Sequence, residues 1–315
     1  MKPFAFVFPG QGSQSVGMLD AWGNHPIVAK TLQEASDALG EDVAALIKNG
    51  PKEALALTTN TQPVMLVSAI AAYRVWLAET GLVPSVVAGH SLGEYSALVA
   101  SGVLTLAQAA PLVRLRAQAM QDAVPVGQGA MAAILGLDAA KIIAVCADIT
   151  SANGEIGSVQ AANFNDPGQT VISGSKAAVD AACEQLKAAG AKRALILPVS
   201  APFHSQLMRP AAEKLQEALK AVTFAAPQIP VINNIDVSVQ TDAAAIKDAL
   251  YRQAFGPVRW VECVAAIKAR GVTTIVECGP GKVLAGLVKR IDAELTGAAL
   301  FDPASLAEVK TLLQG

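Results

Sequence analysis

Short apolar runs alternate along the chain with longer stretches in which apolar residues recur at helical spacing. The runs 4–8 and 86–88 predict buried strands, whereas 64–79, 94–100 and 106–123 have the pattern of helices. Strands that alternate with helices in this way are typical of an α/β fold with a mainly parallel sheet.

The pattern changes in the middle of the chain. The segments predicted there are, in order, a strand at 130–137, a helix at 138–147, strands at 158–163 and 169–173 around a turn at 165–168, a helix at 175–189 and a strand at 191–197. This βαββαβ order is the split, ferredoxin-like arrangement.

The first pattern then resumes, with predicted helices at 207–222 and 258–270 and predicted strands at 231–235 and 274–277. We therefore expect a large α/β domain formed by residues 1–126 and 197–315, into which a small ferredoxin-like domain, residues 127–196, is inserted. A cleft between the two domains would lie close to Ser91.

Composition excludes several classes of protein. With 315 residues, 52% hydrophobic and 16% charged, the chain has enough apolar residues for a packed core, and its net charge of −2 gives no reason to expect nucleic acid or an anionic membrane as partner. The N-terminal apolar run is too short for a signal peptide, and no stretch approaches the roughly 18 apolar residues of a membrane helix. The four cysteines are widely spaced and predict reduced core residues, so we expect a cytoplasmic protein.

The most informative segment is Gly89-His90-Ser91-Leu92-Gly93, which lies between the apolar run 83–88 and the helix that begins at Glu94. A G-x-S-x-G sequence in this context is typical of a nucleophilic serine on a sharp strand-to-helix turn. The glycines remove Cβ atoms that would clash there, and the helix behind Ser91 directs backbone N–H groups toward a bound carbonyl. The alternative is a serine that only caps the helix, and the pentapeptide alone leaves both open.

A nucleophilic serine needs a base, and the chain has three histidines. His25 lies in a polar loop, and His90 precedes Ser91 directly, so neither is well placed to take the Ser91 proton. His204, in a loop between a strand and a helix, is the remaining candidate unless it is an ordinary loop residue. No acidic residue between Ser91 and His204 follows a strand in an obvious loop, so a backbone carbonyl could orient the imidazole, which argues against an ordinary esterase.

The loop after the first strand contains Gly10-Gln11-Gly12. It is not a phosphate-binding fingerprint, because G-x-G-x-x-G would need glycine where the chain has Ser15. Its glycines allow the backbone N–H of Gln11 to approach a ligand, where it could join the N–H of Leu92 in an oxyanion hole. The alternative is a plain turn.

Two arginines, Arg114 and Arg116, lie two positions apart in the predicted helix 106–123 and therefore on different faces. One of them could point inward, where a guanidinium would need a bound carboxylate as partner. Otherwise both are surface residues.

Taken together, these segments resemble the malonyl-CoA:acyl carrier protein transacylases of fatty acid synthesis, which belong to the acyltransferase-domain family. The matching runs are Phe8-Pro9-Gly10-Gln11-Gly12-Ser13-Gln14, Gly89-His90-Ser91-Leu92-Gly93-Glu94-Tyr95, Leu115-Arg116, Asn163-Phe164-Asn165-Asp166-Pro167-Gly168-Gln169, Ala201-Pro202-Phe203-His204-Ser205 and Glu277-Cys278-Gly279-Pro280-Gly281. The resemblance implies an α/β-hydrolase-like large domain.

The resemblance also implies a role for each matching residue. Ser91 would be the acylated nucleophile and His204 its base. The amides of Gln11 and Leu92 would form the oxyanion hole, Arg116 would hold the malonyl carboxylate, and the carbonyl of Gln253 would orient His204. The remaining positions would line the substrate site: His90, Asn163 and Phe203.

The reaction implied by the resemblance is a ping-pong transfer of malonyl from malonyl-CoA to the phosphopantetheine thiol of acyl carrier protein, with no metal or other cofactor. Two alternatives are a thioesterase or esterase with the same Ser-His pair and a non-catalytic module that binds carrier protein. We expect a monomer, and a chain without a fused domain favours fatty acid over polyketide synthesis. A basic surface for the carrier protein is predicted from Lys187, Lys192, Arg193, Lys214, Arg252, Lys282, Lys289 and Arg290.

Overall fold

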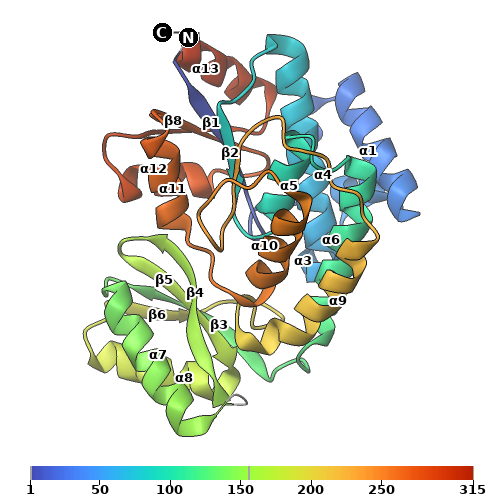
Figure 1. Cartoon of the computed structure of the whole chain (residues 1–315). Coiled ribbons are helices and arrows are strands. Elements are labelled where there is room, and N and C mark those ends of the chain that lie inside the picture. Colours follow the sequence, from blue (N-terminus) through green and yellow to red (C-terminus); the bar gives the residue numbers. More distant parts are fainter. Residues whose placement is uncertain (1, 155–156, 315) are drawn as a thin grey trace.

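A five-stranded parallel sheet forms the centre of the computed structural model, which describes residues 2–154 and 157–314. In the order β7-β2-β1-β8-β9, the strands are Val231–Ile232, Val86–Gly89, Phe4–Phe8, Thr274–Cys278 and Thr296–Leu300 (Figure 1). Every residue of β1, β2 and β8 is buried. Nearly continuous apolar runs are expected in such strands, because helices cover both faces of a parallel sheet.

Helices surround this sheet and connect its strands. Those before the small domain are α1 (Pro26–Leu39), α2 (Val43–Asn49), α3 (Lys52–Ala56), α4 (Thr58–Thr80), α5 (Gly93–Ala100) and α6 (Leu106–Asp122), with a short 3-10 helix at Asp20–Trp22. Those after it are α9 (Arg209–Lys220), α10 (Ala243–Phe255), α11 (Trp260–Ala269), α12 (Val283–Ile291) and α13 (Pro303–Gln314), with a 3-10 turn at Gln206–Met208.

Helix α4 is the main buried helix of the large domain. Its Trp76 ring packs edge-on against Phe6 of β1, with centroids 5.5 Å apart. The helix begins earlier than predicted and includes Pro63, which has no N–H for the Thr59 carbonyl. The guanidinium of Arg114 donates to that carbonyl at 2.7 Å, so a side chain from α6 replaces the missing backbone bond.

The middle of the chain forms a separate antiparallel sheet. Its strands, in the order β4-β5-β3-β6, are Val159–Asp166, Gln169–Ser175, Gly129–Leu135 and Arg193–Ile196. Helices α7 (Ala139–Asn153) and α8 (Lys176–Ala188) pack on this sheet, which lies at the end of the molecule away from both chain termini (Figure 1). The βαββαβ order and the fold class are confirmed, while the domain limits at 127 and 196 stay a prediction.

The small sheet is joined to the large domain at Val258. The Val258 N–H donates to the Ala162 carbonyl at 2.8 Å, and its own carbonyl accepts from Phe164 N–H at 2.9 Å, so the segment before α11 extends the edge of β4. These bonds hold β4 beside the carboxyl ends of the large sheet. Any site at those ends is therefore bordered by the small domain.

Several elements differ from the sequence-based prediction. The strand predicted at 231–235 ends at Ile232, because Asn233 and Asn234 leave the sheet and make side-chain bonds instead. Other elements were not predicted at all: α1, α2, α3, α10, β9 and α13. Helix α1 has only three buried residues, Val28, Thr31 and Ala35, and only one of them is a large apolar residue, so apolar spacing alone separates this surface helix poorly from a loop.

Candidate active site

Ser91 lies in the sharp turn between β2 and α5, with φ at 53°. A Cβ on Gly89 would come within 1.9 Å of the Gly93 carbonyl, and a Cβ on Gly93 would come within 2.0 Å of the Phe8 carbonyl oxygen. No side chain larger than hydrogen fits at either position without moving the backbone. The pentapeptide therefore forms the strained elbow expected from its glycines.

His204 faces Ser91 from the loop before α9. Its Nε2 lies 2.7 Å from Ser91 Oγ, and its Nδ1 lies 2.9 Å from the Gln253 carbonyl and 3.1 Å from the Gly256 carbonyl. Because carbonyl oxygens only accept, Nδ1 carries the proton and Nε2 is left as the acceptor for the serine hydroxyl. The ring is thus oriented by two backbone carbonyls at the end of α10, of which Gly256 was not predicted.

The imidazole is held in its neutral form. Burial of the ring, and then the positive charge of Arg116, lower the pKa of His204 from 6.5 to about 3. A base that stays neutral in this way is able to accept a proton throughout the physiological pH range.

The pH dependence of Ser91 acylation is expected to reflect this shift. The rate should stay level as the pH falls through 6.5, the ordinary pKa of histidine, and should fall only toward the folded value of about 3. The unfolded chain binds a proton at the ordinary value and the folded chain does not, so the free energy of unfolding decreases as the pH falls between these two values. Single-turnover acylation and unfolding, both measured as a function of pH, would check this. A decrease in the acylation rate near pH 6.5, with the protein still folded, would contradict it.

Arg116 points inward from α6 and is 2% exposed. Its Nη1 donates to Gln62 Oε1 at 2.6 Å, and its Nη2 donates to Ser91 Oγ at 3.1 Å and to Gln253 Oε1 at 3.2 Å. All three acceptors are neutral, and within residues 2–154 and 157–314 Arg116 forms no ion pair. A buried positive charge beside the serine hydroxyl is therefore available to an anionic group of a substrate.

Arg114 lies on the other face of α6. It donates to the Thr59 carbonyl at 2.7 Å and to Asn60 Oδ1 at 2.8 Å, and it pairs with Glu41 at the surface. The two arginines therefore differ as the helical spacing predicted, with only Arg116 directed to Ser91.

The amides predicted to form an oxyanion hole border the elbow. Leu92 precedes the first turn of α5, and Gln11 lies in the turn after β1, where its Oε1 accepts from Thr58 Oγ1 at 2.6 Å. In the part of the chain that the structure describes, neither backbone N–H donates to a protein acceptor. Both are thus free to donate to a substrate carbonyl.

His90 turns away from Ser91. Its Nε2 lies 2.9 Å from Asn165 Oδ1, and its ring lies 5.5 Å from that of Trp260. Together with Gln11 and Arg290 it lines a cavity of about 400 Å³ between the loop after β1, the adjoining ends of β4 and β5, and α12. The prediction that His90 is not the base of Ser91 agrees with this geometry, and its role in lining a substrate site stays a prediction.

The two other residues predicted to line the substrate site are Asn163 and Phe203, and both are buried. Asn163 is buried in β4 beside Val258, and Phe203 is 7% exposed and packs in the main core next to His204. In the described part of the chain neither side chain forms a hydrogen bond with Ser91, so their roles stay a prediction. Asn165, two positions after Asn163, is the asparagine that contacts His90.

Sequence reasoning missed three polar residues of the site, namely Gln62, Glu94 and Asn234, all fully or almost fully buried. Gln62 interrupts the apolar pattern of α4, and Asn234 lies inside the strand predicted at 231–235, so both had a weak signal as polar residues at apolar positions. Glu94 had no such signal, because it stands at the start of a predicted helix, where acidic side chains are common.

The predicted basic surface is not one patch. Lys282 and Arg290 line the cavity next to His90, whereas Lys214 lines a separate groove with Arg114. Arg252 is engaged by Asp236 and Asp248. Lys282 and Arg290 are thus the members of the predicted surface that lie beside His90, and the binding of carrier protein by this surface stays a prediction.

Residues 2–154 and 157–314 contain no group of three or more His, Cys, Asp or Glu side chains that could hold a metal ion. None of the helices within these ranges has the length and apolar character needed to span a membrane. All four cysteines are buried and unpaired, in agreement with the prediction of reduced core residues.

Comparison with known proteins gives a consistent result over the whole chain. The family model described as the acyl transferase domain matches residues 5–300. Relatives named malonyl CoA-acyl carrier protein transacylase include that of Salmonella typhimurium, 54% identical with 99% of this chain and 100% of the relative covered. That of Escherichia coli K12 is 54% identical, with 98% of each chain covered.

Solved structures agree with these relatives. The crystal structure of an acyl-carrier-protein S-malonyltransferase from Burkholderia pseudomallei is similar with a TM-score of 0.95 at 63% identity, covering 99% of this chain and 100% of that one. A type II PKS acyl-carrier protein in complex with its malonyl-transacylase is similar with a TM-score of 0.95 at 50% identity, covering 100% of both chains.

Proposed function

The chain belongs to the acyl transferase domain family and transfers malonyl groups from malonyl-CoA to acyl carrier protein, and we propose that it does so through a malonyl ester on Ser91. The observation that carries the proposal is the Arg116 guanidinium, which is buried with neutral partners 3.1 Å from Ser91 Oγ. A substrate whose thioester carbonyl lies at Ser91 and whose carboxylate lies at Arg116 has the shape of a malonyl group.

In the first half of the reaction, Ser91 Oγ attacks the thioester carbon while His204 Nε2 takes the hydroxyl proton. Negative charge develops on the carbonyl oxygen, where the N–H groups of Gln11 and Leu92 would donate to it. Collapse of this intermediate breaks the carbon–sulfur bond, and the proton on His204 passes to the leaving sulfur of coenzyme A. The product is malonyl-Ser91.

The second half runs in the opposite sense. His204, neutral again, takes the proton of the phosphopantetheine thiol of acyl carrier protein, and the sulfur attacks the ester carbon. The ester bond breaks, and the proton returns from His204 to Ser91 Oγ. No residue other than this Ser-His pair has to change protonation state.

The proposal is tested by mixing the protein with malonyl-CoA and measuring the intact mass, followed by fragmentation of the peptide that contains Ser91. We expect one malonyl group on Ser91 and its transfer when carrier protein is added. An unchanged mass would contradict the enzyme and favour a carrier-binding module. Rapid appearance of free malonate without carrier protein would favour a thioesterase instead.

We propose that the protein is a cytoplasmic monomer that needs no metal or bound cofactor, since the reaction above uses only side chains, backbone amides and the two thiols.

A further inference from the structure

Asn234 touches the nucleophile's turn at three points, although it lies in the loop after β7. Its Oδ1 accepts from the Ser91 N–H at 2.8 Å, and its Nδ2 donates to the Gly89 carbonyl at 2.7 Å. Its own backbone N–H donates to Glu94 Oε2 at 2.9 Å. One fully buried residue therefore contacts the beginning, the middle and the end of the turn.

Such contacts matter because the turn is strained. A serine with φ at 53° lies in the left-handed region, which costs about 1–3 kcal/mol and persists only where the surroundings hold it. The Ser91 N–H points away from the helix and would have no acceptor without the Asn234 carboxamide. A buried N–H left unpaired would favour another conformation of the turn.

We propose that Asn234 is a positioning residue for the transfer reaction: its carboxamide holds Ser91 in the strained backbone conformation that directs Oγ to His204. The inference rests on the proposed role of Ser91 as the nucleophile. Asn234 itself does not touch substrate, so its effect passes through the backbone of Ser91.

The other peptide group of Ser91 is held by the helix that also holds the base. Gln253 Nε2 donates to the Ser91 carbonyl at 3.0 Å and to Glu94 Oε2 at 2.9 Å, while the Gln253 carbonyl accepts from His204. The nucleophile and the base are therefore both hydrogen-bonded to α10. Asn234 supplies the one contact that α10 does not make, the acceptor for the Ser91 N–H.

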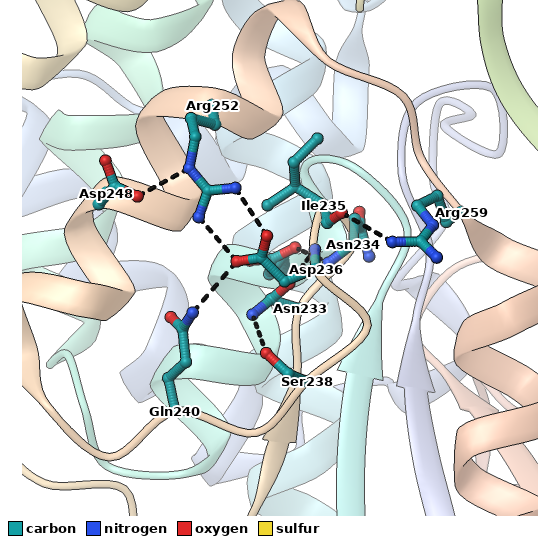
Figure 2. A network of polar contacts seen from close by, with 10 residues as sticks. Asn233, Asn234, Ile235, Asp236, Ser238, Gln240, Asp248, Arg252 and Arg259 are labelled. Carbon is teal, nitrogen blue, oxygen red and sulfur yellow. Dashed lines mark hydrogen bonds and ion pairs between the residues drawn. The ribbon is translucent and has the colours of Figure 1, made fainter.

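The Asn234 loop is in turn fixed to α10. Asp236 receives both Nη groups of Arg252, at 2.6 and 2.7 Å, and Arg252 precedes Gln253 in the helix (Figure 2). Asn233 Oδ1 accepts from the Asp236 N–H at 2.7 Å, which closes the loop on itself (Figure 2). The carboxamide of Asn234 is thus presented to the elbow by a loop with its own internal bonds.

The test measures how fast an uncharged alkyl fluorophosphonate phosphonylates Ser91, with loss of fluoride, because this probe has no carboxylate for Arg116 to bind and needs no carrier protein. For Asn234→Ala we expect the maximal labelling rate to fall about 100-fold, the effect of misplacing a reacting atom by about 1 Å, with half-saturation by the probe little changed. Ser305→Ala is the control for loss of a buried polar side chain outside the site, since its Oγ accepts from the Phe301 and Asp302 N–H groups at 3.0 and 2.9 Å near the start of α13, and this variant should label like the wild type. Thermal unfolding of each variant shows whether it is folded.

Asn234→Asp gives a second readout that loss of stability alone would not produce. Its carboxyl would reproduce both side-chain bonds only when protonated, with C=O accepting from Ser91 N–H and O–H donating to the Gly89 carbonyl. The titratable and charged groups that surround this position are Glu94, Arg116, His204, Asp236, Arg252, Arg259 and Cys263. All of them are present in the wild type as well, so the informative quantity is the ratio of the two labelling rates.

We expect the ratio of Asn234→Asp to wild type to rise as the pH falls. A ratio that does not change with pH, or a folded Asn234→Ala that labels at the wild-type rate, would overturn this inference and leave the proposed function standing. Failure of the wild type itself to label would overturn the proposed function together with the inference.

Discussion

Replacing His204 with alanine is expected to lower the single-turnover rate of Ser91 acylation by malonyl-CoA about 10⁴-fold, the upper end of the range for loss of a general base. His204 Nε2 is 2.7 Å from Ser91 Oγ, and in the described part of the chain no other base contacts that hydroxyl. Without the imidazole, the serine must lose its proton to water. Rapid mixing followed by intact-mass detection measures the rate, and equilibrium binding of malonyl-CoA should change little.

The matched control for this variant is His25→Ala. His25 caps α1 by accepting from the Ile27 N–H at 3.3 Å, so its removal is expected to cost about 1 kcal/mol of stability without any effect on the rate per folded molecule. A fast His204→Ala enzyme would mean that another group accepts the proton, and the assignment of the base would be wrong.

Replacing Arg116 with alanine is expected to lower kcat/KM for malonyl-CoA about 10³-fold, which corresponds to about 4 kcal/mol for a buried, charge-assisted contact to a carboxylate. Transfer of an acetyl group, which has no carboxylate, should fall much less. The quantity to measure is therefore the ratio of kcat/KM for malonyl transfer to kcat/KM for acetyl transfer. Arg116 also influences Ser91 Oγ and His204, and this effect is common to both substrates, so it cancels in the ratio.

Arg114→Ala is the control from the same helix. It removes the bond to the Thr59 carbonyl and should lower stability, but the malonyl-to-acetyl ratio should match that of the wild type. If Arg116→Ala lowered malonyl and acetyl transfer by the same factor, Arg116 would support the serine rather than bind the carboxylate.

Much of the fold could be predicted from the sequence, because its core elements carry their own patterns. The strands around Phe6, Val87 and Val276 are short apolar runs, and the small domain shows its βαββαβ order. Surface helices such as α1 and α10 escaped prediction, since most of their buried positions hold small or polar side chains, such as Thr31 in α1 and Gln253 in α10, which give weak apolar contrast.

The candidate site could be predicted where the chain has only a few residues of the type that the chemistry requires. Three histidines and one serine elbow left His204 as the base to be considered, and helical spacing separated Arg114 from Arg116. The assignment of the Gln253 carbonyl came only from the family resemblance, because a backbone carbonyl has no signature in a sequence.

The local conditions for chemistry at Ser91 can be read from neighbouring residues: two glycines permit the turn, a helix follows it, and no acid stands in the usual place. The contacts that hold the turn, in contrast, come from distant parts of the chain. Asn234, Gln253 and Glu94 come together because β7, α10 and α5 meet at the carboxyl ends of the sheet. Hydrogen bonds between residues far apart in the chain depend on three-dimensional placement, which no local pattern encodes.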